Sequence, residues 1–246
     1  MNPQDQIAEA FVAPHRDAFH AAADDLAAAF RFSPGPLFRE AANSNTPPTA
    51  LRPGAKRALD LAIALPMLAI CAPLLAVLAL IVFLDTGGPV LFRQTRLGRG
   101  GKPFSIFKFR TMRVTENGDT ISQARRDDAR ITRSGKWLRR TSLDELPQLL
   151  NVIAGDMSVV GPRPHARAHD LHYAALIAGY DLRQAVKPGI TGWAQVNGHR
   201  GETPTAEAMR ARVDLDVWYA RNASLGLDLQ ILLRSPLAVL GQRNAY

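Results

Sequence analysis

The chain has 246 residues, of which 47% are hydrophobic and 21% charged, so it is long enough for one domain with a real core, or one domain plus a tail. Its net charge of +8 favours phosphorylated substrates, anionic lipid headgroups or nucleic acid as partners. The single cysteine, Cys71, excludes an intrachain disulfide and a cysteine zinc site.

The N-terminal part of the chain has the composition of an arm without a core. Ala, Pro, Asn and Ser are frequent there, and proline-containing stretches at 33–36 and 46–48 break any helix. The sequence therefore predicts a mostly disordered arm over residues 1–54 and a functional domain over residues 55–246. No basic and apolar pattern of a secretory signal peptide is evident in the arm.

Residues 61–84 form one long apolar segment. They carry no charge and lie between Asp60 and Asp85, and about 20 such residues suffice to cross a bilayer. Pro66 and Pro73 lie inside the segment, where proline removes a hydrogen bond and bends a helix. Lys and Arg flank both ends, whereas a spanning helix has an excess at one end. This balance favours a re-entrant helix-break-helix, broken at Pro73, over a transmembrane helix or a buried core helix.

Two β-prone runs, at 90–96 and 104–110, follow the apolar segment. The glycine-rich residues 98–101 between them have the composition of a turn, so a β-hairpin is expected. In the second run two phenylalanines alternate with Lys108 and Arg110, which places both cations on one face. These cations form a solvated basic face, a phosphate-binding wall, or both.

The rest of the chain is predicted to be mainly helical. Helical segments are expected over 128–155, 166–186 and 205–240, with a bend at Pro236. The apolar surface of the last segment suits either core packing or a membrane interface. With the hairpin, these segments predict a mostly helical α/β fold.

Asp144 and Glu145 are adjacent carboxylates among arginines. Ser142 and Glu145 have the spacing of a capping box, which is the structural interpretation of this motif. A helix that begins instead at Asp144 places Pro147 in its first turn, where proline is tolerated, and Asp144 at the positive end of the helix. A carboxylate there can attack phosphorus and form an acyl phosphate.

Attack on a pyrophosphate requires that the repulsion between the two anions is offset by a divalent cation and by guanidinium groups. Glu145 offers a hard oxygen ligand for Mg²⁺. Arg139, Arg140 and Arg163 can clamp phosphate oxygens, and the prolines on both sides of Arg163 stiffen its backbone.

Five motifs occur in a specific order along the chain, together with Pro73 in the apolar segment. The motifs are Lys56-Arg57-Ala58-Leu59-Asp60, Lys108-Phe109-Arg110-Thr111-Met112, Ser142-Leu143-Asp144-Glu145-Leu146-Pro147-Gln148, Gly161-Pro162-Arg163-Pro164 and the glycine-rich stretch 187–198. Over roughly residues 55–246 the chain thus closely resembles the bacterial sugar transferase family of monotopic polyprenyl-phosphate phosphoglycosyl transferases.

The resemblance implies a re-entrant membrane helix that carries a compact α/β catalytic domain on the cytoplasmic face of the bacterial inner membrane. It implies transfer of a sugar-1-phosphate from a UDP-sugar to undecaprenyl phosphate, with release of UMP, to initiate exopolysaccharide or related glycan synthesis. The C-terminal stretches resemble the branch that often transfers glucose-1-phosphate. Galactose and N-acetylated sugars remain alternatives.

The resemblance also assigns roles to residues. Asp144 is the nucleophile that takes the phosphosugar covalently, and Glu145 is the Mg²⁺ ligand. The expected phosphate ligands are Arg139, Arg163, Lys108 and Arg110. The expected partners are a UDP-sugar, undecaprenyl phosphate and membrane lipid, without nucleic acid, and homo-oligomerisation is left open. A non-catalytic, membrane-tethered basic scaffold is the alternative of a different class, but it gives the carboxylate pair no role.

Overall fold

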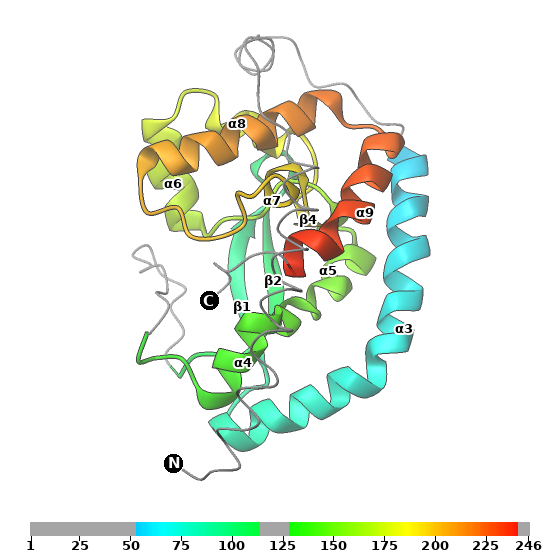
Figure 1. The fold of residues 1–246 in the computed structure, drawn as a ribbon, viewed down its shortest axis with the longest axis vertical. Helices are drawn as coiled ribbons and strands as arrows, with labels where there is room; N and C mark the ends of the chain where they lie inside the picture. The colour runs from blue at the N-terminus through cyan, green and yellow to red at the C-terminus, as the bar shows by residue number, and fades with distance from the viewer. Residues whose placement is uncertain (1–52, 114–127, 241–246) are drawn as a thin grey trace, which may run out of the picture.

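The computed structural model describes residues 53–113 and 128–240 (Figure 1). The arm predicted over residues 1–54 therefore lies outside the described residues, except for its last two positions. The described elements are α3 (Pro53–Thr86), β1 (Leu91–Leu97), η1 (Arg99–Gly101), β2 (Pro103–Phe109), α4 (Arg133–Thr141), η2 (Leu143–Glu145), α5 (Gln148–Ala154), β3 (Ser158–Val160), α6 (Arg167–Leu176), η3 (Tyr180–Ala185), β4 (Gly189–Thr191), α7 (Trp193–Val196), α8 (Ala206–Asn222) and α9 (Leu225–Leu240).

The apolar segment lies in α3, which is continuous over its described length although Pro66 and Pro73 lie inside it. The expected separation into two helices at Pro73 is not observed, because a proline removes one hydrogen bond and bends a helix without having to end it. Figure 1 shows the bend: one arm of α3 runs beside α5 and α9, and the other passes below α4.

One face of α3 is apolar and exposed. The helix is long and apolar enough to cross a membrane, and only 11% of its most apolar window is buried in the domain, which is too little for a core helix. Ala64, Leu78 and Val82 are its buried contacts with the domain. The large exposed apolar side chains are Leu65, Met67, Ile70, Leu74, Val77, Leu80, Ile81, Phe83 and Leu84.

The charged first turns of α3 attach the helix to the rest of the domain. Asp60 is 1% exposed, and its Oδ1 accepts hydrogen bonds from Ser158 Oγ at 2.8 Å and from the Val159 amide at 3.0 Å. Lys56 Nζ lies 2.7 Å from Asp228 of α9. Each charge therefore has a partner in an element distant in the sequence.

Two further contacts attach α3 near its two ends. Arg57 donates to the carbonyls of Val152 and Ile153, in the last turn of α5, at 2.5 and 2.6 Å. At the opposite end, Asp85 Oδ2 accepts from the Ser134 amide at 2.8 Å and from its hydroxyl at 2.6 Å, at the start of α4. Both ends of the apolar helix are thus bound to the same domain.

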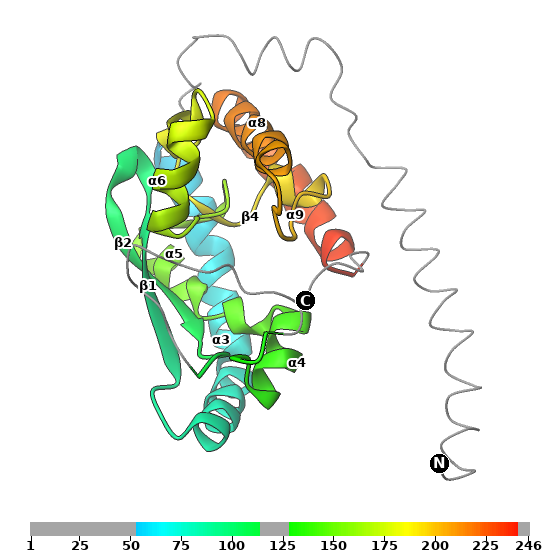
Figure 2. The ribbon, with the colours of Figure 1, turned by 90° about the vertical axis from the view of Figure 1, so that its left-hand side faces the viewer.

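The predicted hairpin is confirmed. Strands β1 and β2 pair antiparallel, with Leu91 opposite Phe109 and Leu97 opposite Pro103. Asn151 joins the hairpin to α5, because its Oδ1 accepts from the Phe107 amide at 2.9 Å. Figure 2 shows the hairpin along one edge of the domain, with α6 and α8 at one end and α4 at the other.

The C-terminal half contains a parallel pair, β3 and β4, that sequence patterns did not indicate. Gly161 directly follows β3 and Gly189 begins β4. A Cβ on Gly189 would lie 2.1 Å from the Gly161 amide nitrogen, so the two backbones touch. The helix expected over 166–186 is divided into α6 and η3 by Gly179, whose φ is +75°. The helical segments expected over 128–155 are α4, η2 and α5, and the acidic pair lies in η2.

We expect Asp60→Ala to lower the melting temperature of the detergent-solubilised protein by about 5–10 °C. The change leaves the buried Val159 amide without an acceptor, removes one of the two acceptors of the Ser158 hydroxyl and removes a partner of Lys56, a loss of about 2–4 kcal/mol. The measurement is thermal unfolding followed by circular dichroism. The control is Asp156→Ala, which removes an exposed carboxylate. Equal shifts in both variants would contradict the anchoring role.

Candidate active site

The acidic pair lies on a short connection between two helices. Ser142 ends α4 in the left-handed conformation, with φ at +57°, and its side chain caps no helix. Asp144 and Glu145 follow in the 3₁₀ turn η2, and Pro147 directly precedes α5. The capping box and the helix beginning at Asp144 are therefore both wrong, because the left-handed turn at Ser142 closes one helix before the next can start.

Glu145 is the centre of a cluster of charges. Lys108 Nζ donates to its Oε1 at 2.7 Å, and Arg163 Nη1 donates to its Oε2 at 2.9 Å. Arg163 Nη2 also donates to Oε1, which makes the guanidinium contact bidentate. These two cations hold the pKa of Glu145 well below its usual range against the opposing effect of burial. Glu145 is therefore a fixed anion.

Asp144 has the opposite electrostatic environment. Its side chain is buried, and burial raises the pKa of Asp144 to about 6, with a further increase from the Glu145 charge. The charges of Lys108, Arg139 and Arg163 oppose this shift. None of the ion pairs between described residues includes Asp144. A buried carboxylate without a bonded cation is poorly stabilised, which suits a nucleophile.

The structure brings together three of the four predicted phosphate ligands. Lys108 and Arg163 contact Glu145, and Arg139 lies close enough to lower the pKa of Asp144. Arg110 instead donates to the carbonyls of Met112, at 3.2 Å, and Arg113, at 2.8 Å. Strand β2 ends at Phe109, so Arg110 directly follows the strand that was expected to contain it, and the alternation could not indicate that its side chain turns toward the following backbone.

Two arginines that sequence reasoning missed also belong to the site. Arg200 donates from Nη2 to Ser142 Oγ at 2.7 Å, and the carboxylates of Glu145 and Asp144 favour its charge while burial lowers its pKa. Burial and the nearby charge of Arg163 lower the pKa of Arg96 to about 10. Both lie far from Asp144 in the sequence, and no local pattern distinguishes them from surface arginines.

The donor set at Glu145 is compatible with Mg²⁺. Its Oε2 accepts one hydrogen bond, and a carboxylate oxygen has two lone pairs, so one acceptor position remains. In the described part of the chain, no group of three or more His, Cys, Asp or Glu side chains could hold a metal by itself. Mg²⁺ commonly combines one or two carboxylates with substrate phosphates and water. An ion at Glu145 would depend on the substrate in this way.

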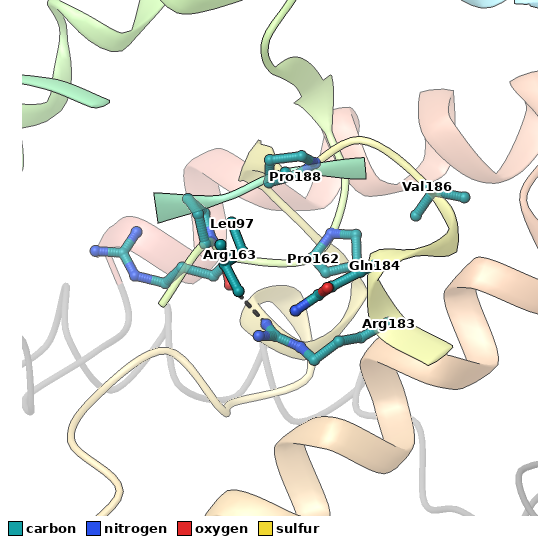
Figure 3. A pocket seen from close by; sticks show the side chains of 9 residues that line it. Leu97, Pro162, Arg163, Arg183, Gln184, Val186 and Pro188 are labelled. Atoms are coloured by element: carbon teal, nitrogen blue, oxygen red, sulfur yellow. Dashed lines mark hydrogen bonds between the residues drawn. The ribbon is translucent and has the colours of Figure 1, made fainter. Parts of the chain in front are cut away.

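A small hollow lies behind the Gly161–Pro164 loop. It is lined by Leu97, Pro162, Arg183, Gln184, Val186 and Pro188, among others. Figure 3 shows that the guanidinium of Arg163 points away from these side chains, whereas Arg183 reaches the Arg163 backbone. The Glu145 carboxylate lies on the other side of Arg163, so this hollow is separate from it.

The whole described domain matches one family model. The model for the bacterial sugar transferase matches residues 51–242. The chain belongs to this family. The matched range contains every charged residue of the site described above, so its geometry is that of a family member.

Curated relatives are similar over the same region. The UDP-glucose:undecaprenyl-phosphate glucose-1-phosphate transferase of Escherichia coli (strain K12) is 50% identical over 82% of this chain and 44% of its own length. The protein of the same name from Caulobacter vibrioides is 53% identical over 78% of this chain and 72% of its own. The exopolysaccharide production protein PSS of Rhizobium leguminosarum is 46% identical over 78% of this chain and 98% of its own length. The chain thus spans less than half of the Escherichia coli relative.

We expect Asp144→Asn to stabilise the metal-free protein at neutral pH. Folding raises the pKa of Asp144 from 3.8 to about 6, so ionisation of Asp144 destabilises the folded state. This destabilisation is absent at about pH 3.5 and complete above about pH 6. Melting temperatures in EDTA should therefore show a gain of several degrees at pH 7.5 that disappears at low pH.

The matched control is Glu145→Gln, for which the sign is reversed. Because the folded state lowers the pKa of Glu145, its carboxylate stabilises the protein above its usual pKa, and this contribution is lost as the pH falls. Glu145→Gln should lower the melting temperature at pH 7.5. A loss of stability in both variants at pH 7.5 would contradict the assigned environments.

Proposed function

We propose that this chain transfers glucose-1-phosphate from UDP-glucose to undecaprenyl phosphate, with release of UMP, through a covalent phosphosugar intermediate on Asp144. The observation that carries the proposal is the buried carboxylate of Asp144, without a bonded cation, beside a Glu145 that two cations hold as an anion. The names of the relatives from Escherichia coli and Caulobacter support the donor and acceptor.

In the first step, an Asp144 carboxylate oxygen bonds to the phosphorus that carries glucose. The bond from this phosphorus to the bridging oxygen breaks, and UMP leaves with the electron pair. A pKa of about 6 keeps most of Asp144 ionised at neutral pH, so no separate base is needed. Burial keeps the carboxylate weakly solvated, and so less of its hydration must be removed before attack.

In the second step, a phosphate oxygen of undecaprenyl phosphate attacks the same phosphorus. The acyl phosphate bond breaks, and Asp144 returns as a carboxylate. The guanidinium groups of Arg139, Arg163 and Arg200 lie around the pair and stabilise negative charge on the transferred group. Glu145 would hold Mg²⁺ through Oε2, and the ion supplies neutralisation of the pyrophosphate charge.

Glucose is the proposed sugar because it is named for both of these relatives. The name of the Rhizobium relative supports a role in exopolysaccharide synthesis. A non-catalytic basic scaffold remains the alternative of a different class, but nothing in scaffolding calls for a buried, unpaired carboxylate beside a paired one. The cost of burying Asp144 is only partly offset by the nearby cations, and such a cost favours a catalytic role.

The proposed location is the cytoplasmic face of the inner membrane, with α3 as a re-entrant helix. Its exposed apolar side chains favour contact with lipid. Asp60, near one end of α3, binds β3, and Asp85, at the other end, binds α4. A domain outside the bilayer occupies one side of the membrane only. A bent helix attached in this way enters and leaves the membrane on the same side. In the proposed arrangement the carboxylates would lie near the lipid phosphates.

Purified protein should release UMP from UDP-glucose when Mg²⁺ and undecaprenyl phosphate are present, faster than from UDP-galactose or N-acetylated donors, and not after EDTA treatment. Without acceptor, label from glucose-1-phosphate should remain on the protein. Asp144→Asn should lose at least about 1,000-fold in turnover and all trapped label, because no nucleophile remains. Trapped label on this variant would exclude Asp144 as the nucleophile.

Cysteine labelling tests the topology of α3. In a Cys71→Ser background, Ala55→Cys and Pro89→Cys place single thiols at exposed positions beside the two ends of the helix. Both should react with a membrane-impermeant maleimide in inside-out vesicles and neither in intact spheroplasts. Labelling of one end from each side would indicate a transmembrane helix instead.

A further inference from the structure

The backbone of the Arg163 loop is held by two arginines from other elements, of which Arg183 is buried and Arg96 partly buried. Arg183 of η3 donates from Nη2 to the Arg163 carbonyl at 2.6 Å, and Figure 3 shows this contact from within the hollow. Arg96 of β1 donates from Nη1 to the next carbonyl, that of Pro164, at 3.3 Å. The carbonyls of Arg163 and Pro164 are thus both held by hydrogen bonds from other elements. The Arg163 side chain extends to Glu145 on the other side of the loop.

Arg183 donates hydrogen bonds to three other residues. Nε and one Nη2 hydrogen bind Asp216 Oδ2, at 3.1 and 2.7 Å, and the other Nη2 hydrogen binds the Arg163 carbonyl. Nη1 donates to the Tyr180 hydroxyl at 3.2 Å and also lies 2.9 Å from His165 Nδ1. One planar group therefore sets the relative positions of α8, η3 and the Arg163 loop.

The charge of this group is compensated within the protein. Arg183 is 4% exposed, and its carboxylate partner Asp216 of α8 is equally buried. Asp170 lies 3.6 Å from Arg183 Nη1 and accepts a hydrogen bond from the Tyr180 hydroxyl. A buried guanidinium with several buried acceptors holds its position firmly, since moving it would leave these groups unpaired.

The loop transmits this position to the Arg163 side chain because it is stiff. Pro162 and Pro164 restrict the backbone on both sides of Arg163. Gly161 packs directly on Gly189. A Cβ on Gly161 would lie 2.3 Å from the Lys187 carbonyl oxygen. A displaced Arg163 carbonyl therefore displaces the whole residue, including the guanidinium that contacts Glu145.

We propose that Arg183 and Asp216 form a positioning pair that sets where the Arg163 guanidinium stands at the reaction centre. Neither residue contacts the carboxylate pair, so both act through Arg163. This inference rests on the proposed function for its kinetic test. It adds to that function a second layer of residues, drawn from η3 and α8, that controls the anion-binding arginine.

A double-mutant cycle tests the positioning pair. Arg183→Lys keeps the charge but loses the five-donor geometry, and we expect kcat/KM for UDP-glucose to fall about 10–100-fold. In an Arg163→Lys background the same change should cost less than about threefold, because the bidentate contact that it positions is already gone. Asp216→Asn, a milder change, should show the same coupling if Arg183→Lys does not fold.

Arg221→Lys is the matched control. Arg221 is a buried arginine of α8, the helix that also carries Asp216, and any loss from a general weakening of the fold should be the same in both backgrounds. An equal factor for Arg183→Lys in both backgrounds would overturn the positioning role and leave a purely structural one.

Amide hydrogen exchange provides a readout that is independent of turnover. Arg183→Lys should accelerate exchange in residues 158–169 more than in residues 143–154, because only the first segment contains the carbonyls held by Arg183 and Arg96. Unchanged exchange in 158–169 would overturn the inference. Absence of turnover in the unmodified protein, with accelerated exchange in the variant, would instead reject the proposed function alone.

Discussion

The contact of Glu145 with Lys108 and Arg163 is the interaction on which the site depends. It joins three elements distant in the sequence: the hairpin, the connection η2 and the loop after β3. Because both cations bind Glu145 directly, neither ion-pairs with the neighbouring Asp144. The unequal distribution of partners gives two adjacent carboxylates opposite pKa shifts, and such a separation distinguishes a reactive group from a supporting one.

The apolar helix is integrated with this site rather than appended to it. Its charged ends are used as structural contacts, with Asp60 at β3, Arg57 at the end of α5 and Asp85 at the start of α4. Helices α4 and α5 are the two that flank the acidic pair. A change in the depth or bend of α3 would therefore reach the reactive carboxylates through two short helices.

The arginines around the site divide into those that contact the carboxylates and those that bind the backbone. Arg163 belongs to the first group, and Arg183 and Arg96 to the second. Guanidinium suits both tasks, since its planar donors bind a carboxylate bidentately or several carbonyls at once without loss of charge. Some of the many basic residues thus make structural contacts inside the protein, and not all of them form a surface for anionic partners.

The sequence by itself predicted the apolar helix, the hairpin, and an adjacent pair of carboxylates, Asp144 and Glu145, among basic residues, because hydrophobic length, alternation and local motifs are short-range properties. It did not determine that Ser142 closes a helix, that Arg110 turns away, or that Arg200 and Arg183 belong near Arg163. Those outcomes depend on which buried donors find acceptors when distant segments meet. Only the tertiary structure decides that pairing, since no local pattern encodes the partner.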